Sequence, residues 1–226
     1  MGRDNSPRER QRRHLERKTN SRAGHDRILI VSEGARTEPN YFNEIRAVFR
    51  LHTASVQVHH SELGTAPIHV VKYAERLFNN GHPHKGIQKR AFEQVYVVFD
   101  RDEHQSYSDA LNKAESLDGK LRNDLKSPVK FRAIASVPCF ELWLLLHFEA
   151  ISAPLHRSDV FRRLKRHLPE YEKGAADIFG RTQEMLDSAF GRARGLPKEA
   201  RFTAEGPYTD VHELVEVLIG LKKTPS

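Results

Sequence analysis

The chain has 226 residues, of which 38% are hydrophobic and 30% are charged, and its net charge is +7. No apolar run approaches the roughly 18 to 20 residues of a membrane-spanning helix, and the N-terminus lacks the apolar segment of a signal peptide. The single cysteine, Cys139, excludes an internal disulfide framework and fits a reducing compartment. We therefore expect a cytoplasmic protein without a membrane partner, built as one large domain or as a medium-sized domain with an appendage.

The positive charge lies mainly at the N-terminus, where residues 1–27 hold nine Lys and Arg against four Asp and Glu. This stretch has almost no apolar side chains, so we expect a basic tail over residues 1–26 that is disordered on its own. Arg12 and Arg13 in this tail could contact the phosphates of nucleic acid. The alternative is a tail that only keeps the protein in solution.

The first predicted strand, over residues 28–31, is a short apolar run that enters a glycine turn. Glu33 follows this strand directly, where an acid is poorly placed for packing and well placed for a ligand. Pro39 suits the first turn of a helix, and apolar side chains then recur at helical spacing as far as Phe49. We interpret Glu38 mainly as a favourable charge at the start of this helix.

A second strand is predicted over residues 55–59, and a helix over residues 68–78. The loop over residues 79–86 that follows contains Gly, Pro and two histidines. His82 and His84 could suggest a metal site, but no second cluster accompanies them, so we interpret both as exposed to solvent.

The third strand, over residues 94–99, is an apolar run that leads directly into Asp100-Arg101-Asp102. A strand buried on both faces is typical of a parallel sheet covered by helices, and ligands bind such sheets at the carboxyl ends of the strands. Alternate side chains of an extended chain share a face, so Asp100 and Asp102 can share one cation. Mg²⁺ is the usual cation for a cluster of carboxylate oxygens. The competing interpretation is a polar loop in which one aspartate caps the next helix.

A polar helix is predicted over residues 108–125, a fourth strand over 129–135, and an apolar helix over 140–148 that carries Glu141 and His147. A buried carboxylate is costly without a partner. Glu141 therefore either caps its helix or joins an acidic cluster at the edge of the sheet. We interpret His147 as a hydrogen-bonded histidine of the core.

The last third of the chain is predicted to be helical, over residues 158–168, 182–192 and 209–221. Arg162 and Arg163 belong to a basic face of the first of these helices. That face could contact nucleic acid, and a solvated helix surface is the equal alternative.

The alternation of strands and helices predicts an α/β fold. We expect a Rossmann-like three-layer α/β/α core with a mainly parallel four-stranded sheet over residues 27–150. A helical C-terminal part, over residues 151–226, should pack on this core.

The two strands that end in acidic residues resemble those of a Toprim domain, a family found in topoisomerases, primases and overcoming-lysogenization-defect nucleases. The segments that carry the resemblance are Ile28-Leu29-Ile30-Val31-Ser32-Glu33-Gly34 and Val97-Val98-Phe99-Asp100-Arg101-Asp102. That family places one glutamate after its first strand and an Asp-x-Asp after its third. The resemblance implies that Glu33 matches the glutamate and that Asp100 and Asp102 match the acidic pair. It also implies phosphodiester chemistry that depends on Mg²⁺ or Mn²⁺.

Other segments are similar to the RloB family, whose members are encoded near bacterial restriction and anti-phage loci. They are Glu33-Gly34-x-x-Thr37-Glu38-Pro39-x-Tyr41-Phe42, Pro138-Cys139-Phe140-Glu141-Leu142-Trp143-Leu144-Leu145-Leu146-His147-Phe148 and Thr209-Asp210-Val211-His212. The similarity covers about residues 27 to 221 and leaves the basic tail outside. The Toprim pattern does not include Glu38, Glu141 or His147, so the resemblance to RloB alone suggests roles for them.

We therefore expect a Mg²⁺-dependent nuclease of anti-phage defence that acts on DNA or RNA, with a partner ATPase or other defence protein as a further option. The expected catalytic residues are Glu33, Asp100, Asp102 and Glu141, of which the first three would bind the metal. The residues expected to bind nucleic acid are Arg12, Arg13, Arg36, Arg101, Arg162 and Arg163. The alternative is a non-catalytic module that binds nucleic acid or a nucleotide. A haloacid-dehalogenase-type phosphatase is disfavoured, because that family normally carries Asp-x-Asp on its first strand.

Overall fold

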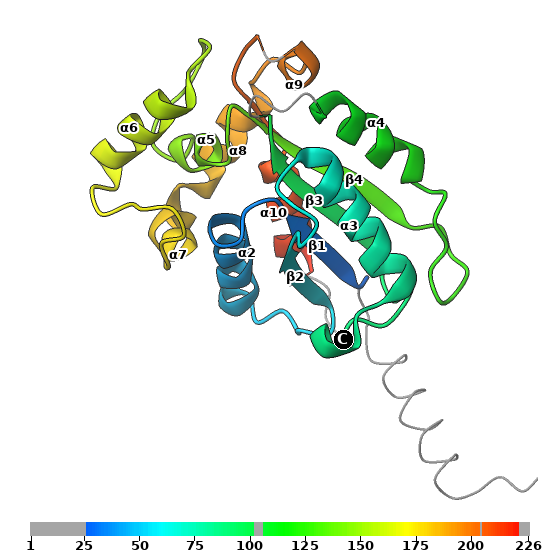
Figure 1. The fold of residues 1–226 in the computed structure, drawn as a ribbon. Coiled ribbons are helices and arrows are strands. Elements are labelled where there is room, and N and C mark those ends of the chain that lie inside the picture. The colour runs from blue at the N-terminus through cyan, green and yellow to red at the C-terminus, as the bar shows by residue number, and fades with distance from the viewer. Residues whose placement is uncertain (1–25, 102–105, 204, 222–226) are drawn as a thin grey trace, which may run out of the picture.

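The computed structural model describes residues 26–101, 106–203 and 205–221. Its centre is a five-stranded sheet with the strand order β2-β1-β3-β4-β5 (Figure 1). The strands are β1 (Ile28–Ser32), β2 (Val56–His60), β3 (Gln94–Asp100), β4 (Lys130–Val137) and β5 (Tyr208–Thr209). The first four are parallel, and β5 pairs antiparallel with β4. The predicted α/β class is confirmed, and β5 adds a fifth strand to the four that we expected.

Helices cover both faces of the sheet, as Figure 1 shows. One face packs against α3 (Pro67–Asn80) and α4 (Tyr107–Leu117), and the other against α2 (Thr37–Val48) and α10 (Val211–Gly220). Every residue of β1 is buried. Its alternate side chains enter the two opposite clusters, which is why this strand reads as a continuous apolar run.

The remaining helices lie beside α2 and α10 and share their hydrophobic cluster. They are α5 (Glu141–Leu145), α6 (Arg157–His167), α7 (Ile178–Thr182) and α8 (Leu186–Arg194), and α9 (Ala200–Thr203) lies against β4 and β5. Short 3₁₀ turns occur at Pro83–Lys85 and Gln183–Met185.

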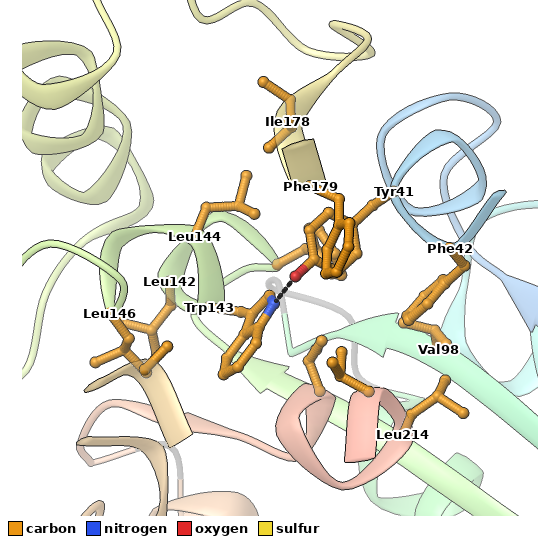
Figure 2. Packing of buried hydrophobic residues seen from close by; sticks show 14 of the residues in the cluster. Tyr41, Phe42, Val98, Leu142, Trp143, Leu144, Leu146, Ile178, Phe179 and Leu214 are labelled. Carbon is orange, nitrogen blue, oxygen red and sulfur yellow. Dashed lines mark hydrogen bonds between the residues drawn. The ribbon is translucent and has the colours of Figure 1, made fainter. Parts of the chain in front are cut away.

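Figure 2 shows the centre of this shared cluster, where the Trp143 indole N–H donates a hydrogen bond of 2.8 Å to the Tyr41 hydroxyl. The rings of Tyr41 and Phe179 meet edge to face, with centroids 5.6 Å apart. Residues from the first, middle and last parts of the chain therefore build one core.

Several predicted boundaries are wrong. The helix expected over 108–125 ends at Leu117, because Asp118 has an extended backbone and its carboxylate accepts the Phe131 N–H of β4 at 2.9 Å. The helix expected over 209–221 begins at Val211, since Thr209 belongs to β5 and Asp210 is the N-cap residue. The helix expected over 182–192 is divided among the end of α7, a short 3₁₀ turn and α8.

Candidate functional site

Four carboxylates gather at the carboxyl edge of the sheet, from β1, the start of α2, β3 and the start of α5: those of Glu33, Glu38, Asp100 and Glu141. The pairing of β1 with β3 brings the first and third of these together, as expected of two residues that would bind one metal ion. The Glu33 N–H donates to the Val98 carbonyl at 2.9 Å. In return, the Glu33 Oε2 accepts the Asp100 backbone N–H at 3.1 Å.

Glu38 reaches back from the first turn of α2 to the turn that follows β1. Its Oε1 accepts the Gly34 N–H at 3.3 Å. A Cβ on residue 34 would overlap the Oε2 of this carboxylate, so glycine leaves the space that Glu38 occupies. Glu38 is 5% exposed. Our interpretation of it as a helix-dipole charge therefore missed its burial in the acidic cluster.

Glu141 is the first residue of α5, a few residues after β4 ends, and it is 3% exposed. The Tyr171 hydroxyl donates to its Oε1 at 3.3 Å. Its negative charge raises the pKa of both Glu38 and Asp100, which places it in the acidic cluster as well as at a helix start. Of the two alternatives left open for Glu141, the structure favours the cluster.

The cluster is electrostatically unfavourable when all its members are ionised. Burial, followed by the charges of Glu33 and Glu141, raises the pKa of Glu38 to about 7. Burial also raises the pKa of Asp100 well above its usual range, and the charges of Glu38, Glu33 and Glu141 act in the same direction. A cation placed among these groups would reverse both shifts.

One cation of the protein itself lies beside the cluster. The Arg157 Nη2, from the first residue of α6, is 3.8 Å from the Asp100 Oδ2 and lowers the pKa of that carboxyl. Neither Arg157 nor Tyr171 was predicted, because both come from segments without a motif and reach the site only through tertiary packing.

The family model of the RloB-like protein matches residues 28–218. The chain belongs to the RloB-like protein family. The match contains all four clustered carboxylates and excludes the basic N-terminal segment. Neither a curated protein nor a solved structure matches the chain.

The acidic site of this RloB-like chain has donors that suit a hard divalent cation. Among the residues that the structure describes, no three His, Cys, Asp or Glu side chains are arranged so that they could hold one ion. Mg²⁺ commonly takes only one or two carboxylates and completes its shell with water and substrate phosphates. Glu33 and Asp100, held together by the hydrogen bond between them, fit that requirement. Asp102, the third expected ligand, lies outside the described residues.

The predicted nucleic-acid-binding arginines that the structure describes come from three different parts of the chain. Arg36 is exposed at the start of α2, and the Arg101 guanidinium lies over the Tyr107 ring, 5.0 Å from its centroid. Both follow the acidic residues of their strands closely in sequence. Arg162 and Arg163 lie on α6 and pair with Asp159 and Glu149 respectively, while Arg12 and Arg13 lie outside the described residues.

The histidines behave largely as interpreted. His147 is 2% exposed, and its Nδ1 pairs with the Trp143 carbonyl at 3.0 Å. Burial lowers its pKa to about 4, so it is neutral at neutral pH. His84 is exposed, whereas His82 is half-buried and lies with its ring 6.1 Å from that of His84.

No helix within the described ranges is both long and apolar enough to cross a membrane.

Proposed function

We propose that this RloB-like protein is a Mg²⁺-dependent nuclease, of the Toprim type, that hydrolyses phosphodiester bonds of DNA or RNA in bacterial anti-phage defence. The observation that supports this proposal is the convergence of Glu33, Glu38, Asp100 and Glu141 at the carboxyl edge of a parallel sheet. Ligands bind at this edge in open α/β sheets. Buried carboxylates with strongly raised pKa values are a frequent mark of active sites.

Glu33 and Asp100 would hold the metal in this proposal. Bound Mg²⁺, or Mn²⁺ in its place, stabilises negative charge on a phosphate and makes water a better nucleophile. The pKa of Glu38 is about 7 in the metal-free cluster and would fall when the metal binds, so Glu38 would act as a carboxylate that accepts a proton. Since its Oε1 accepts the Gly34 N–H, Oε2 is the atom that would carry the proton. Arg36 and Arg101, beside the two strand ends, would bind phosphates through their guanidinium groups.

A non-catalytic module that binds nucleic acid or a nucleotide is the second candidate. The observation in its favour is the lack, among the described residues, of a three-donor group that could hold a metal.

Cleavage assays separate the two candidates. The protein is incubated with tRNA, single-stranded DNA and duplex DNA, with and without Mg²⁺ or Mn²⁺. We expect one of these substrates to be cleaved only when the metal is present, and we expect Asp100→Asn to abolish cleavage. Asp109→Asn, which makes the same chemical change at an exposed position of α4, is the matched control and should leave cleavage intact. Binding without cleavage, under every metal condition, would support the non-catalytic module instead.

A further inference from the structure

The segment that follows α6 is hydrogen-bonded to the first turn of α2, which also carries Glu38 of the acidic site. The Gly174 N–H donates to the Thr37 hydroxyl at 3.0 Å, and the Asn40 side-chain amide donates to the Gly174 carbonyl at 2.9 Å. Gly174 has a φ of 82°, and a Cβ there would lie 2.7 Å from the Cβ of Arg36. Only glycine fits this contact easily, and the contact joins the segment between α6 and α7 to the start of α2.

Two side chains, one from α6 and one from the segment after it, reach the carboxylates: Arg157 lies beside Asp100, and the Tyr171 hydroxyl donates to Glu141. The position of Arg157 is not explained by helix stability. It is the first residue of α6, where the helix dipole disfavours a positive charge. Its side chain is 34% exposed, whereas that of Asp100 is 8% exposed. The arginine side chain therefore extends from solvent to a buried carboxylate.

The distance between these two groups also bears on the role of the arginine. At 3.8 Å, Nη2 and Oδ2 form an ion pair that is longer than a hydrogen bond. This contact is weaker than a hydrogen-bonded ion pair, so a divalent cation can replace the guanidinium at the Asp100 carboxylate. A guanidinium remains protonated at all accessible pH values and presents paired donors that match a phosphate.

We propose that Arg157 is a substrate-binding residue of the acidic site, which pairs with Asp100 before a divalent cation binds and with a phosphate of nucleic acid afterwards. This inference rests on the proposed function. A divalent cation and the guanidinium compete for the Asp100 carboxylate. A phosphate that contacts both the divalent cation and the Arg157 guanidinium removes this competition. The divalent cation and nucleic acid should therefore bind cooperatively.

The test compares Arg157→Gln with wild type in two binding measurements that do not depend on turnover. The first is the increase in melting temperature during a Mg²⁺ titration, which reports cation affinity by mass action. The second is the fluorescence anisotropy of short labelled RNA and DNA of the same sequence, in Ca²⁺ in place of Mg²⁺, at increasing NaCl. Arg181→Gln removes the same charge from an exposed position on α7 and is the matched control.

We expect Arg157→Gln to bind Mg²⁺ more tightly than wild type, because the competing charge is gone. We also expect it to bind nucleic acid about ten-fold more weakly, the size of a lost hydrogen-bonded charge pair. The slope of affinity against salt should fall by about one. An arginine that only neutralises Asp100 gives the same gain in Mg²⁺ affinity, but unchanged or tighter nucleic-acid binding, and that result overturns the proposal.

Two further outcomes can be distinguished from these: a variant that does not fold, and a failure of the proposed function itself. If Arg157→Gln does not fold, Arg157→Lys decides, because it keeps the charge but loses the planar fork of donors. A several-fold loss of nucleic-acid affinity is then expected, and wild-type affinity overturns the proposal. If wild type itself shows neither a Mg²⁺-dependent melting shift nor nucleic-acid binding, the proposed function fails, and the role of Arg157 fails with it.

Discussion

Glu38 is buried among other carboxylates, so its ionisation costs free energy in the folded protein. Its pKa rises from an ordinary value of 4.5 to about 7 on folding. The folded state therefore holds the proton more tightly than the unfolded state. This contribution to stability is complete below about pH 4.5 and is lost as pH rises through about 7.

Glu38→Gln cannot ionise, so we expect it to lack this loss of stability. By linkage, the variant should be more stable than wild type at mildly alkaline pH by up to about 3 kcal/mol. Urea unfolding at mildly acidic and mildly alkaline pH measures the difference. Glu115→Gln, at an exposed position of α4, is the matched control. Equal pH dependence in Glu38→Gln and wild type would contradict the argument.

His147 titrates in the opposite sense. Burial lowers its pKa from 6.5 to about 4, so the unfolded state binds the proton more tightly. The stability that this neutral histidine contributes is present above about pH 6.5 and is lost as pH falls through about 4. We expect wild type to lose stability over that range and His147→Gln to lose less of it. The proposed nuclease activity should change little at neutral pH in the variant, and a large loss of that activity at unchanged stability would contradict a structural role.

At the level of elements, two glycines provide a matched pair. Gly174 has a positive φ and lies against Arg36, whereas Gly191 lies in α8 with open space around the position of a Cβ. Gly174→Ala should destabilise the protein by about 1 to 3 kcal/mol, because it combines backbone strain with a steric overlap. Gly191→Ala should stabilise it by about 1 kcal/mol through helix propensity. Thermal unfolding compares the two, and a stabilised Gly174→Ala would contradict the described contact.

The elements also show which features a sequence can predict. The strands β1 and β3 are apolar runs that can be predicted without knowledge of the fold, and Glu33 and Asp100 follow from their ends. The two-residue β5 was missed because its pairing with β4, rather than local propensity, holds it in the sheet.

Glu38 could have been found from the sequence. It lies three, four and seven residues before Tyr41, Phe42 and Ile45, on the helix face that is buried. Arg157 could not have been found in this way. The packing of α6 brings it beside Asp100, and no residue spacing in the sequence predicts that contact.

At the scale of the whole molecule, the C-terminal helices and the sheet share one hydrophobic cluster rather than two separate cores. The hydrogen bond between Trp143 and Tyr41, together with the contact of Tyr41 with Phe179, joins α5, α2 and α7 at the centre of that cluster. The helical C-terminal part therefore packs on the sheet through this shared cluster. Parts that share a core should unfold together.

We expect the chain to unfold in a single cooperative transition. Trp143 is the only tryptophan and is fully buried, so its fluorescence reports the shared cluster, while far-ultraviolet circular dichroism reports the helices as a whole. The two signals should give the same urea midpoint.

Tyr41→Phe removes the hydroxyl that accepts the indole N–H. It should lower the free energy of unfolding by about 1 to 2 kcal/mol and so lower the urea midpoint of both signals together. Tyr208→Phe, at a hydroxyl outside this cluster, is a matched control, because its loss should leave the Trp143 environment unchanged. Two separated transitions, with only the fluorescence midpoint moved by Tyr41→Phe, would show that the C-terminal helices are a domain of their own.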